Sequence, residues 1–113
     1  MLAPKPPKEM LVDKIIWKSF EGEGDYNKPT YGEPQEISFV KIDRNPQYQA
    51  SLGGKVLIGN AKVFCYAGLT SPLPAFKEQD QLIFDNKEHI ITSAPFFKEP
   101  LLDQIYSWEL VVV

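Results

Sequence analysis

Apolar and polar residues alternate with a period of two along most of this chain, a pattern typical of β-strands that bury one face. In the segment Leu11 to Lys18, for example, Leu11, Ile15 and Trp17 fall on one face. Valine, isoleucine and aromatic residues, which favour strands, dominate these segments. The pattern therefore predicts an all-β, mainly antiparallel fold with at most one short helical turn.

A second strand is predicted over Glu36 to Arg44, and its apolar face changes midway. Ile37 and Phe39 lie on one face, whereas Val40 and Ile42 lie on the other. Because one inserted residue moves every later side chain to the opposite face, this switch predicts a bend or a β-bulge.

The longest strand-like run, Lys55 to Tyr66, is interrupted by Gly59 and Asn60. A glycine at this place is compatible with a tight hairpin or with a bulge in one long strand. We favour the bulge.

The clearest hairpin pairs the segment Gln81 to Phe84 with the segment Glu88 to Thr92. Its turn is Asp85-Asn86-Lys87, in which Asp and Asn tolerate the left-handed backbone region. A last strand, Tyr106 to Val113, has an apolar face of alternate residues. We therefore expect the C-terminus to be tied into a sheet.

Prolines and glycines mark the segments between the strands. The first ten residues contain three prolines among lysines and are predicted to form an extended arm, followed by a single β domain over residues 11–113. Two long loops are predicted, Ser19 to Pro34 and Asn45 to Gly54. The candidate helical turn is Glu99 to Gln104, with Pro100 at its first position.

Composition and charge fit one globular domain. The chain has 113 residues, of which 43% are hydrophobic, so it can build a single core. Its net charge is −3, and 11 of its 12 basic residues are lysines scattered along the sequence. A nucleic-acid-binding protein would gather its positive charge on one face, so we expect no direct role in nucleic-acid recognition.

Catalytic and metal-binding patterns are not recognisable in this sequence. With one histidine, His89, and one cysteine, Cys65, the chain cannot supply the common four-ligand Cys/His zinc site or an internal disulfide. Both residues are interpreted as ordinary strand residues. An enzyme would need carboxylates such as Asp80 or Glu88 to converge in a pocket. We expect no catalytic site, no cofactor and no metal, and we expect synthesis in a reducing cytoplasm.

Loop residues are the better candidates for contacts with a partner. Carboxylates alternate in the first long loop as in a calcium loop, but Tyr26 and Gly32 occupy the positions that need glycine and glutamate. Tyrosines in loops are common at protein contacts, and the only arginine follows a strand. The candidate interaction residues are Glu21, Glu23, Asp25, Tyr26, Tyr31, Arg44 and Tyr48.

Three segments carry a resemblance to a known family: Phe64 to Pro74, Asp80 to Ile91, and Trp108-Glu109-Leu110. Together they resemble the minor capsid proteins of tailed phages and prophages. The resemblance covers the chain after the proline arm and is strongest from Lys62 onward. It implies a small β-barrel or sandwich with long loops.

The same resemblance implies a structural virion protein of the head-completion, or stopper, type. Such a head–tail connector forms a ring between the portal complex and the tail of a long-tailed phage. The implied partners are portal or adaptor proteins on one side and tail or tail-terminator proteins on the other, with DNA only as passing cargo. The protein would be made in the bacterial cytoplasm and reside at the head–tail junction, with no membrane contact.

A different class of function stays open from the residues alone. A stand-alone β-barrel module could use its loop tyrosines to bind a peptide or a carbohydrate. A monomer with a defined small ligand would favour that alternative, whereas association with phage neck proteins would favour the connector.

Overall fold

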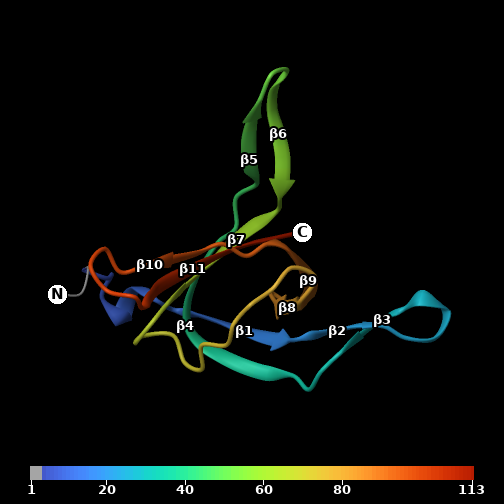
Figure 1. The fold of residues 1–113 in the computed structure, drawn as a ribbon, viewed down its shortest axis with the longest axis horizontal. Coiled ribbons are helices and arrows are strands. Elements are labelled where there is room, and N and C mark those ends of the chain that lie inside the picture. The colour runs from blue at the N-terminus through green and yellow to red at the C-terminus, as the bar shows by residue number, and fades with distance from the viewer. Residues whose placement is uncertain (1–3) are drawn as a thin grey trace.

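Short strands joined by tight turns account for most of the chain in the computed structural model, which describes residues 4–113 (Figure 1). Two short 3-10 segments, η1 (Lys8–Met10) and η2 (Asp25–Asn27), interrupt the strands. The strands are β1 (Asp13–Lys18), β2 (Phe20–Glu23), β3 (Pro29–Tyr31), β4 (Gln35–Asp43), β5 (Gln47–Ser51), β6 (Gly54–Gly59), β7 (Ala61–Tyr66), β8 (Gln81–Phe84), β9 (Lys87–Ser93), β10 (Phe96–Lys98) and β11 (Ile105–Val112).

Six of these strands close into an antiparallel barrel in the order β11-β7-β4-β1-β8-β9. The circle is closed where the C-terminal end of β11 pairs with β9, with Val111 opposite Ser93 and Val112 opposite Ile91. Strand β10 pairs with the N-terminal half of β11, along the same edge of β11 that pairs with β9 further on. The predicted all-β, antiparallel fold is confirmed, and of the two architectures considered the barrel is the one observed.

The barrel interior is filled by the alternate apolar residues of its strands. Strand β7 shows the pattern clearly, because Ala61, Val63 and Cys65 are buried and the residues between them are partly exposed. Aromatic rings complete the core at one end, where Phe76 packs edge-on against Trp108 with ring centroids 5.5 Å apart. The buried core residues are Ile15, Ile37, Val40, Ile42, Ala61, Val63, Cys65, Phe76, Leu82, Phe84, Ile91, Trp108, Leu110 and Val112.

The predicted irregularity in β4 is a β-bulge at Phe39. This residue has a positive φ of 62°, and the register with β1 shifts there, from Asp13 opposite Val40 to Lys14 opposite Ser38. The bulge turns the Phe39 side chain outward, where the ammonium of Lys8 lies 4.1 Å from its ring centroid. The face switch seen in the sequence therefore has the expected cause.

The predicted β8–β9 hairpin is confirmed, with Phe84 opposite Lys87. Asp85 and Asn86 form a two-residue turn and both have positive φ, at 54° and 60°. This geometry is that of a type I′ turn, whose twist matches the twist of the flanking strands.

Both predicted long loops are hairpins instead. Segment Ser19 to Pro34 contains β2 and β3, and segment Asn45 to Gly54 contains β5, which pairs with β6. Tyr31 and Tyr48 accordingly lie in strands. Their neighbours are largely exposed on both faces, so these strands lack the one-sided apolar pattern that sequence reasoning needs.

The segments at Gly59-Asn60 and at Glu99 to Gln104 differ from their predicted structures. At Gly59 and Asn60 the chain passes from β6 into β7 without folding back, so the hairpin alternative is wrong. The favoured single bulged strand is wrong too, because β6 pairs with β5 in one sheet, whereas β7 pairs with β4 and β11 in another. The segment Glu99 to Gln104 consists of bends, so the candidate helical turn is wrong as well. A backbone hydrogen bond from Glu99 N to Gln104 O closes it as a loop instead.

The described part of the N-terminal arm lies against the barrel (Figure 1). The ammonium of Lys5 lies 3.6 Å from a carboxylate oxygen of the buried Glu99, and Tyr106 Oη donates a hydrogen bond of 2.5 Å to Pro4 O. No helix in residues 4–113 is long and apolar enough to cross a membrane.

Asp80 is fully buried, and its carboxylate ties three segments together. Its Oδ1 accepts hydrogen bonds from Phe20 N (2.8 Å) and lies 3.1 Å from Lys77 Nζ. Its Oδ2 accepts from Trp17 Nε1 (3.0 Å) and from Lys77 N (3.1 Å). The carboxylate therefore fixes the end of β1, the start of β2 and the segment before β8, and it is engaged in structural contacts on both oxygens.

We predict that Asp80→Asn destabilises the fold by about 3 kcal/mol, because whichever oxygen the amide nitrogen replaces, it meets two donors. Urea unfolding followed by tryptophan fluorescence measures this change. The control is Asp103→Asn, which breaks only an exposed contact with Lys98 and should leave the unfolding midpoint unchanged. Equal midpoints for the two variants would show that Asp80 does not hold the barrel.

Candidate protein–protein interface

The β5–β6 hairpin projects away from the barrel, and its strands pair only with each other (Figure 1). Tyr48 lies opposite Leu57 on one face, and Gln49 lies opposite Val56 on the other. Tyr48, Val56 and Leu57 are between 51% and 56% exposed, and Leu52 at the turn is fully exposed. Apolar side chains therefore meet solvent on both faces and at the tip.

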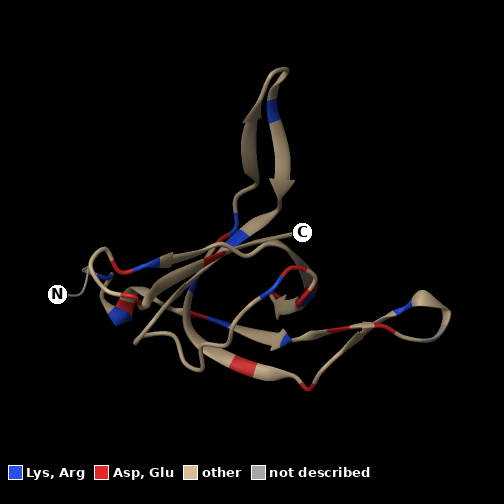
Figure 2. Ribbon diagram, viewed as in Figure 1, with Lys and Arg blue, Asp and Glu red and all other residues tan. Residues whose placement is uncertain are grey.

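Charge is nearly absent from this hairpin. Between Gln47 and Gly59, Lys55 is the only charged residue, seen in Figure 2 as a single blue band. Both outer strand edges are unpaired, although soluble proteins usually protect such edges with charges, prolines or a cover. A free two-stranded hairpin is also only marginally stable in water. These properties are those of a surface that another molecule covers.

The returning strand of the hairpin is fixed where it meets the barrel. A Cβ on Gly59 would clash with the Val111 side chain and lie 2.9 Å from Val112 O, so a glycine is needed for this close approach. Beside it, Asn60 N donates a hydrogen bond of 2.7 Å to Val112 O. The hairpin therefore leaves the barrel from a tightly packed base.

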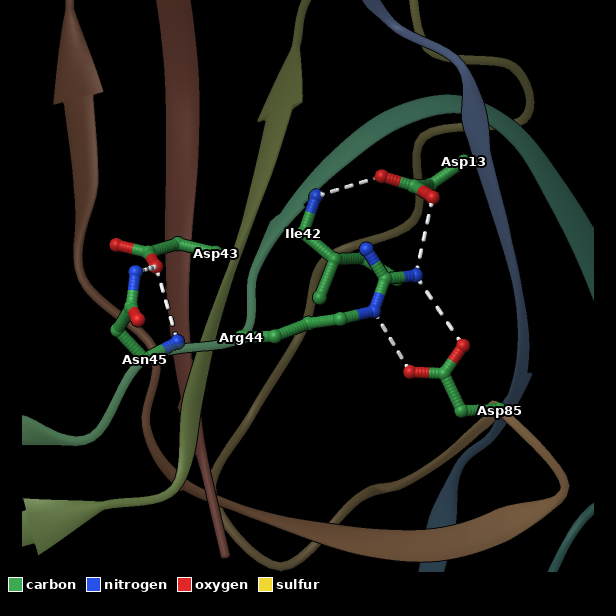
Figure 3. A network of polar contacts seen from close by, with 6 residues as sticks. All are labelled: Asp13, Ile42, Asp43, Arg44, Asn45 and Asp85. Carbon is green, nitrogen blue, oxygen red and sulfur yellow. Dashed lines mark hydrogen bonds and ion pairs between the residues drawn. The ribbon is translucent and has the colours of Figure 1, made fainter.

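The outgoing strand is fixed by Arg44 (Figure 3). Its Nε and Nη2 donate to the two carboxylate oxygens of Asp85 at 2.7 and 3.2 Å, and Nη2 also donates to Asp13 Oδ1 at 3.1 Å. The second oxygen of Asp13 accepts from Ile42 N at 3.0 Å. One guanidinium thus joins the end of β4 to β1 and to the β8–β9 turn.

The electrostatics of this base follow from the same contacts. Hydrogen bonds from Arg44 hold the pKa of Asp85 below its ordinary value and raise the pKa of the guanidinium. The pKa of Asp43 is lowered as well, because its carboxylate accepts from the backbone N and the side-chain amide of Asn45. Negative charge is therefore stabilised at both sides of the point where the hairpin begins.

The β2–β3 hairpin is the second projection (Figure 1). At its root, Phe20 lies opposite Tyr31, with ring centroids 5.9 Å apart in an edge-on contact. At its tip, Tyr26 is 93% exposed and has a positive φ of 61°. The root is therefore ordered by packing, while the tip offers an aromatic ring to solvent.

A groove of about 320 Å³ lies at the root of this second hairpin, against β9. We call it the root groove. Its lining is mostly apolar or aromatic, and Glu23 is its only charged residue. The lining residues are Phe20, Glu23, Pro29, Tyr31, Gln79 and Ile90.

The predicted interaction residues lie in three separate places. Glu21, Glu23, Tyr26 and Tyr31 belong to the β2–β3 hairpin, whereas Arg44 lies at the base of β5–β6 and Tyr48 on β5. Asp25 belongs to η2, and its side chain is outside the described part of the structure. These residues do not form one site.

Sequence reasoning missed the exposed apolar residues Leu52, Val56 and Leu57. The available signal was the charge-poor stretch from Asn45 to Ala61, in which Lys55 is the only charged residue. It also missed a patch at the end of the barrel near the N-terminal arm, which we call the barrel-end patch. Its members are Phe96, Phe97, Leu101, Leu102 and Ile105, each more than one third exposed.

The residues with intrinsic reactivity have structural surroundings. Cys65 is fully buried in β7, and burial raises the pKa of its thiol to about 12. His89 stacks on Phe84 with ring centroids 4.0 Å apart, and its partial burial lowers the pKa of the imidazole. Within residues 4–113, no group of three His, Cys, Asp or Glu side chains could hold a metal ion.

We predict that Arg44→Gln lowers stability at neutral pH by about 0.5 to 1 kcal/mol, the range for an exposed bidentate pair. Because the pKa of folded Asp85 is depressed, its pairing stabilises the fold above the ordinary carboxylate pKa and is lost as pH falls. The difference from the wild type should therefore shrink between roughly pH 5 and pH 3. Urea titrations across this range measure it.

The matched control for this prediction is Lys14→Gln, which removes an exposed lysine 3.8 Å from Glu36 and leaves the hairpin base intact. Limited proteolysis should cut the β5–β6 hairpin faster in Arg44→Gln than in this control. A stability difference that stays constant with pH would show that Arg44 acts through the packing of its aliphatic stem.

Comparison with known proteins gives a family for this fold. The chain is similar to an uncharacterized protein, ORF5, of Lactococcus phage LL-H, with 21% identity over an alignment of 81 residues that covers 69% of each chain. The family described as minor capsid protein matches residues 7–112, which is nearly the whole chain. This protein therefore belongs to the minor capsid protein family.

Proposed function

We propose that this protein is a head–tail connector subunit of the head-completion, or stopper, type, which forms a ring between the portal complex and the tail of a long-tailed phage. Membership of a minor capsid family already implies a structural protein of the virion that contacts other virion proteins. The observation that carries the finer proposal is the projecting, nearly uncharged β5–β6 hairpin on a closed barrel.

A ring of identical subunits requires two different surfaces on each subunit, and each surface must be complementary to the other surface on the next subunit. A closed barrel has few free strand edges, so pairing at a strand edge must use the projecting hairpins or β10. The β5–β6 hairpin has the features of a projection that inserts into a neighbouring subunit, namely apolar side chains, unpaired strand edges and a base held by hydrogen bonds.

A connector also needs contacts with the layers on either side of its ring. The barrel-end patch is apolar and lies away from the β5–β6 hairpin, beside the N-terminal arm (Figure 1). We assign it to contacts with portal or adaptor proteins, or with tail or tail-terminator proteins. In this proposal the protein lies at the head–tail junction.

In this proposal DNA is passing cargo. Glu21 of the β2–β3 hairpin is exposed and lies outside the lining of the root groove, and a carboxylate facing a channel would repel the phosphate backbone and keep DNA sliding. Reversing this charge should then slow DNA ejection, and unchanged ejection would remove the hairpin from the channel wall.

The alternative of a stand-alone peptide- or carbohydrate-binding module receives no support from the tyrosines on which it was based. Tyr26, Tyr31 and Tyr48 lie at the tip of one hairpin, at its root and on the other hairpin. An enzymatic role also loses its first candidate, because both oxygens of Asp80 are engaged in structural contacts.

We predict that the purified protein joins rings of portal and adaptor proteins as a stoichiometric layer. Light scattering gives the mass of the protein alone and of the mixture. A monomer that becomes part of the ring complex supports the connector. A monomer that ignores every neck component contradicts it and favours the free-standing module.

A second prediction concerns the hairpin. The triple variant Leu52→Ser, Val56→Thr and Leu57→Thr should fold with an unchanged circular dichroism spectrum, because these side chains lie outside the core. It should join the ring complex at least tenfold less well, since a tenfold change needs only about 1.4 kcal/mol of lost apolar contact.

The control is Val12→Thr, which makes an exposed apolar residue polar directly before β1 and away from the hairpin. If the control and the triple variant bind equally, the hairpin is not the assembly surface.

A further inference from the structure

We infer that the β5–β6 hairpin of one subunit docks into the root groove of a neighbouring copy of this same chain. This inference rests on the proposed ring, and it names the partner of the hairpin and the surface that receives it. Two observations support it. Both surfaces are mostly apolar, and each carries one charge, Lys55 on the hairpin and Glu23 in the groove, of opposite sign.

The hairpin presents a narrow, nearly uncharged end with exposed apolar side chains. Leu52 is fully exposed at the turn, Val56 and Leu57 follow on the two faces, and Lys55 lies between them and the turn. An occupied receiving site must therefore be apolar and must hold one carboxylate within reach of the ammonium.

The root groove has this chemistry. The rings of Phe20 and Tyr31 and the side chain of Ile90 supply apolar contact, and Glu23 supplies the single negative charge. The nearby Lys77 Nζ is already held by Ser19 Oγ at 2.5 Å and by Asp80 at 3.1 Å. Its charge is therefore compensated by its own contacts and leaves Glu23 available to a partner.

A larger groove on the described surface fits the hairpin less well. It has a volume of about 500 Å³ and lies beside η1 and the start of β1. Lys8 and Lys14 line it, together with Glu9 and Asp13. These two lysines and two carboxylates balance, whereas the root groove carries one uncompensated carboxylate, so charge favours the root groove for Lys55.

The positions of the two surfaces make the contact heterologous. The β2–β3 hairpin precedes β4 and the β5–β6 hairpin follows it, so the two projections leave the barrel from opposite ends of one nine-residue strand (Figure 1). Nine residues of strand span roughly 30 Å. In the proposed ring, each subunit inserts its hairpin into one neighbour and receives the hairpin of another.

Charge exchange tests the predicted pairing of Lys55 with Glu23. Lys55→Glu and Glu23→Lys should each weaken entry into the portal–adaptor complex by about tenfold, a typical effect for a close interfacial charge pair. The double variant should recover most of the wild-type binding, because the pair is restored with reversed signs.

The control reversals are Lys41→Glu on β4 and Glu9→Lys in the competing groove, both exposed. They should leave binding unchanged. Failure of the double variant to recover, or rescue of Lys55→Glu by Glu9→Lys, would overturn the assignment of the root groove.

Cysteine cross-linking tests the contact directly. A chain carrying Leu52→Cys at the tip and Gln79→Cys in the groove should give a ladder of covalent oligomers on oxidation of the assembled protein, because each subunit links to two neighbours. Either substitution alone, or Leu52→Cys combined with Glu9→Cys, should give no ladder. The native Cys65 is fully buried and does not compete.

These experiments separate the inference from the proposed function. Stoichiometric entry into the neck complex without a ladder would overturn the docking site and leave the connector intact. A ladder formed by a protein that ignores portal and adaptor rings would support the self-contact and contradict the connector.

Discussion

The pairing of β11 with β9 is the constraint on which the rest of this structure depends. It brings the C-terminal residues of the chain beside the β8–β9 hairpin, and Val113 exchanges two backbone hydrogen bonds of 3.0 and 3.1 Å with Ile90. Closing the circle removes the edges of the barrel sheet. Unpaired strand edges are therefore confined to the two projecting hairpins and to β10, and these positions are where another molecule can add to the fold.

The projecting hairpins differ from flexible loops because their bases are built into the barrel. Arg44, which lies between β4 and β5, ties the chain entering the hairpin to Asp13 and Asp85, and the close approach of Gly59 to Val111 fixes the end of β6. A surface that is held in place before binding loses less conformational entropy on association. The structure thus combines an apolar tip with a preorganised base, an arrangement that favours assembly.

Local signals in the sequence predict the barrel strands well and the projections badly. The bulge at Phe39 and the turn at Asp85 were predictable, because each produces a sequence pattern within a few residues. The bulge changes the apolar face of the strand, and the turn uses residues that tolerate positive φ. Strand β5 has no such pattern, since it is exposed on both faces.

Contacts between distant segments were equally invisible to sequence reasoning. Asp80 looked like a candidate catalytic carboxylate, and only the fold shows that Trp17, 63 positions away, donates to it. The β9–β11 pairing likewise depends on the curvature of the whole barrel, so it could not be predicted from the sequence of either strand.

The size of the hairpin explains how a connector of this kind could stay a monomer until it meets its template. The 13 residues from Gln47 to Gly59 fall short of the roughly 20 to 30 residues per partner in a typical stable interface. One hairpin contact is therefore weak on its own. On a preformed ring each subunit is held beside its neighbours at a high effective concentration, so two weak contacts per subunit act together. In the proposed connector, the subunits therefore assemble only on a preformed portal–adaptor ring.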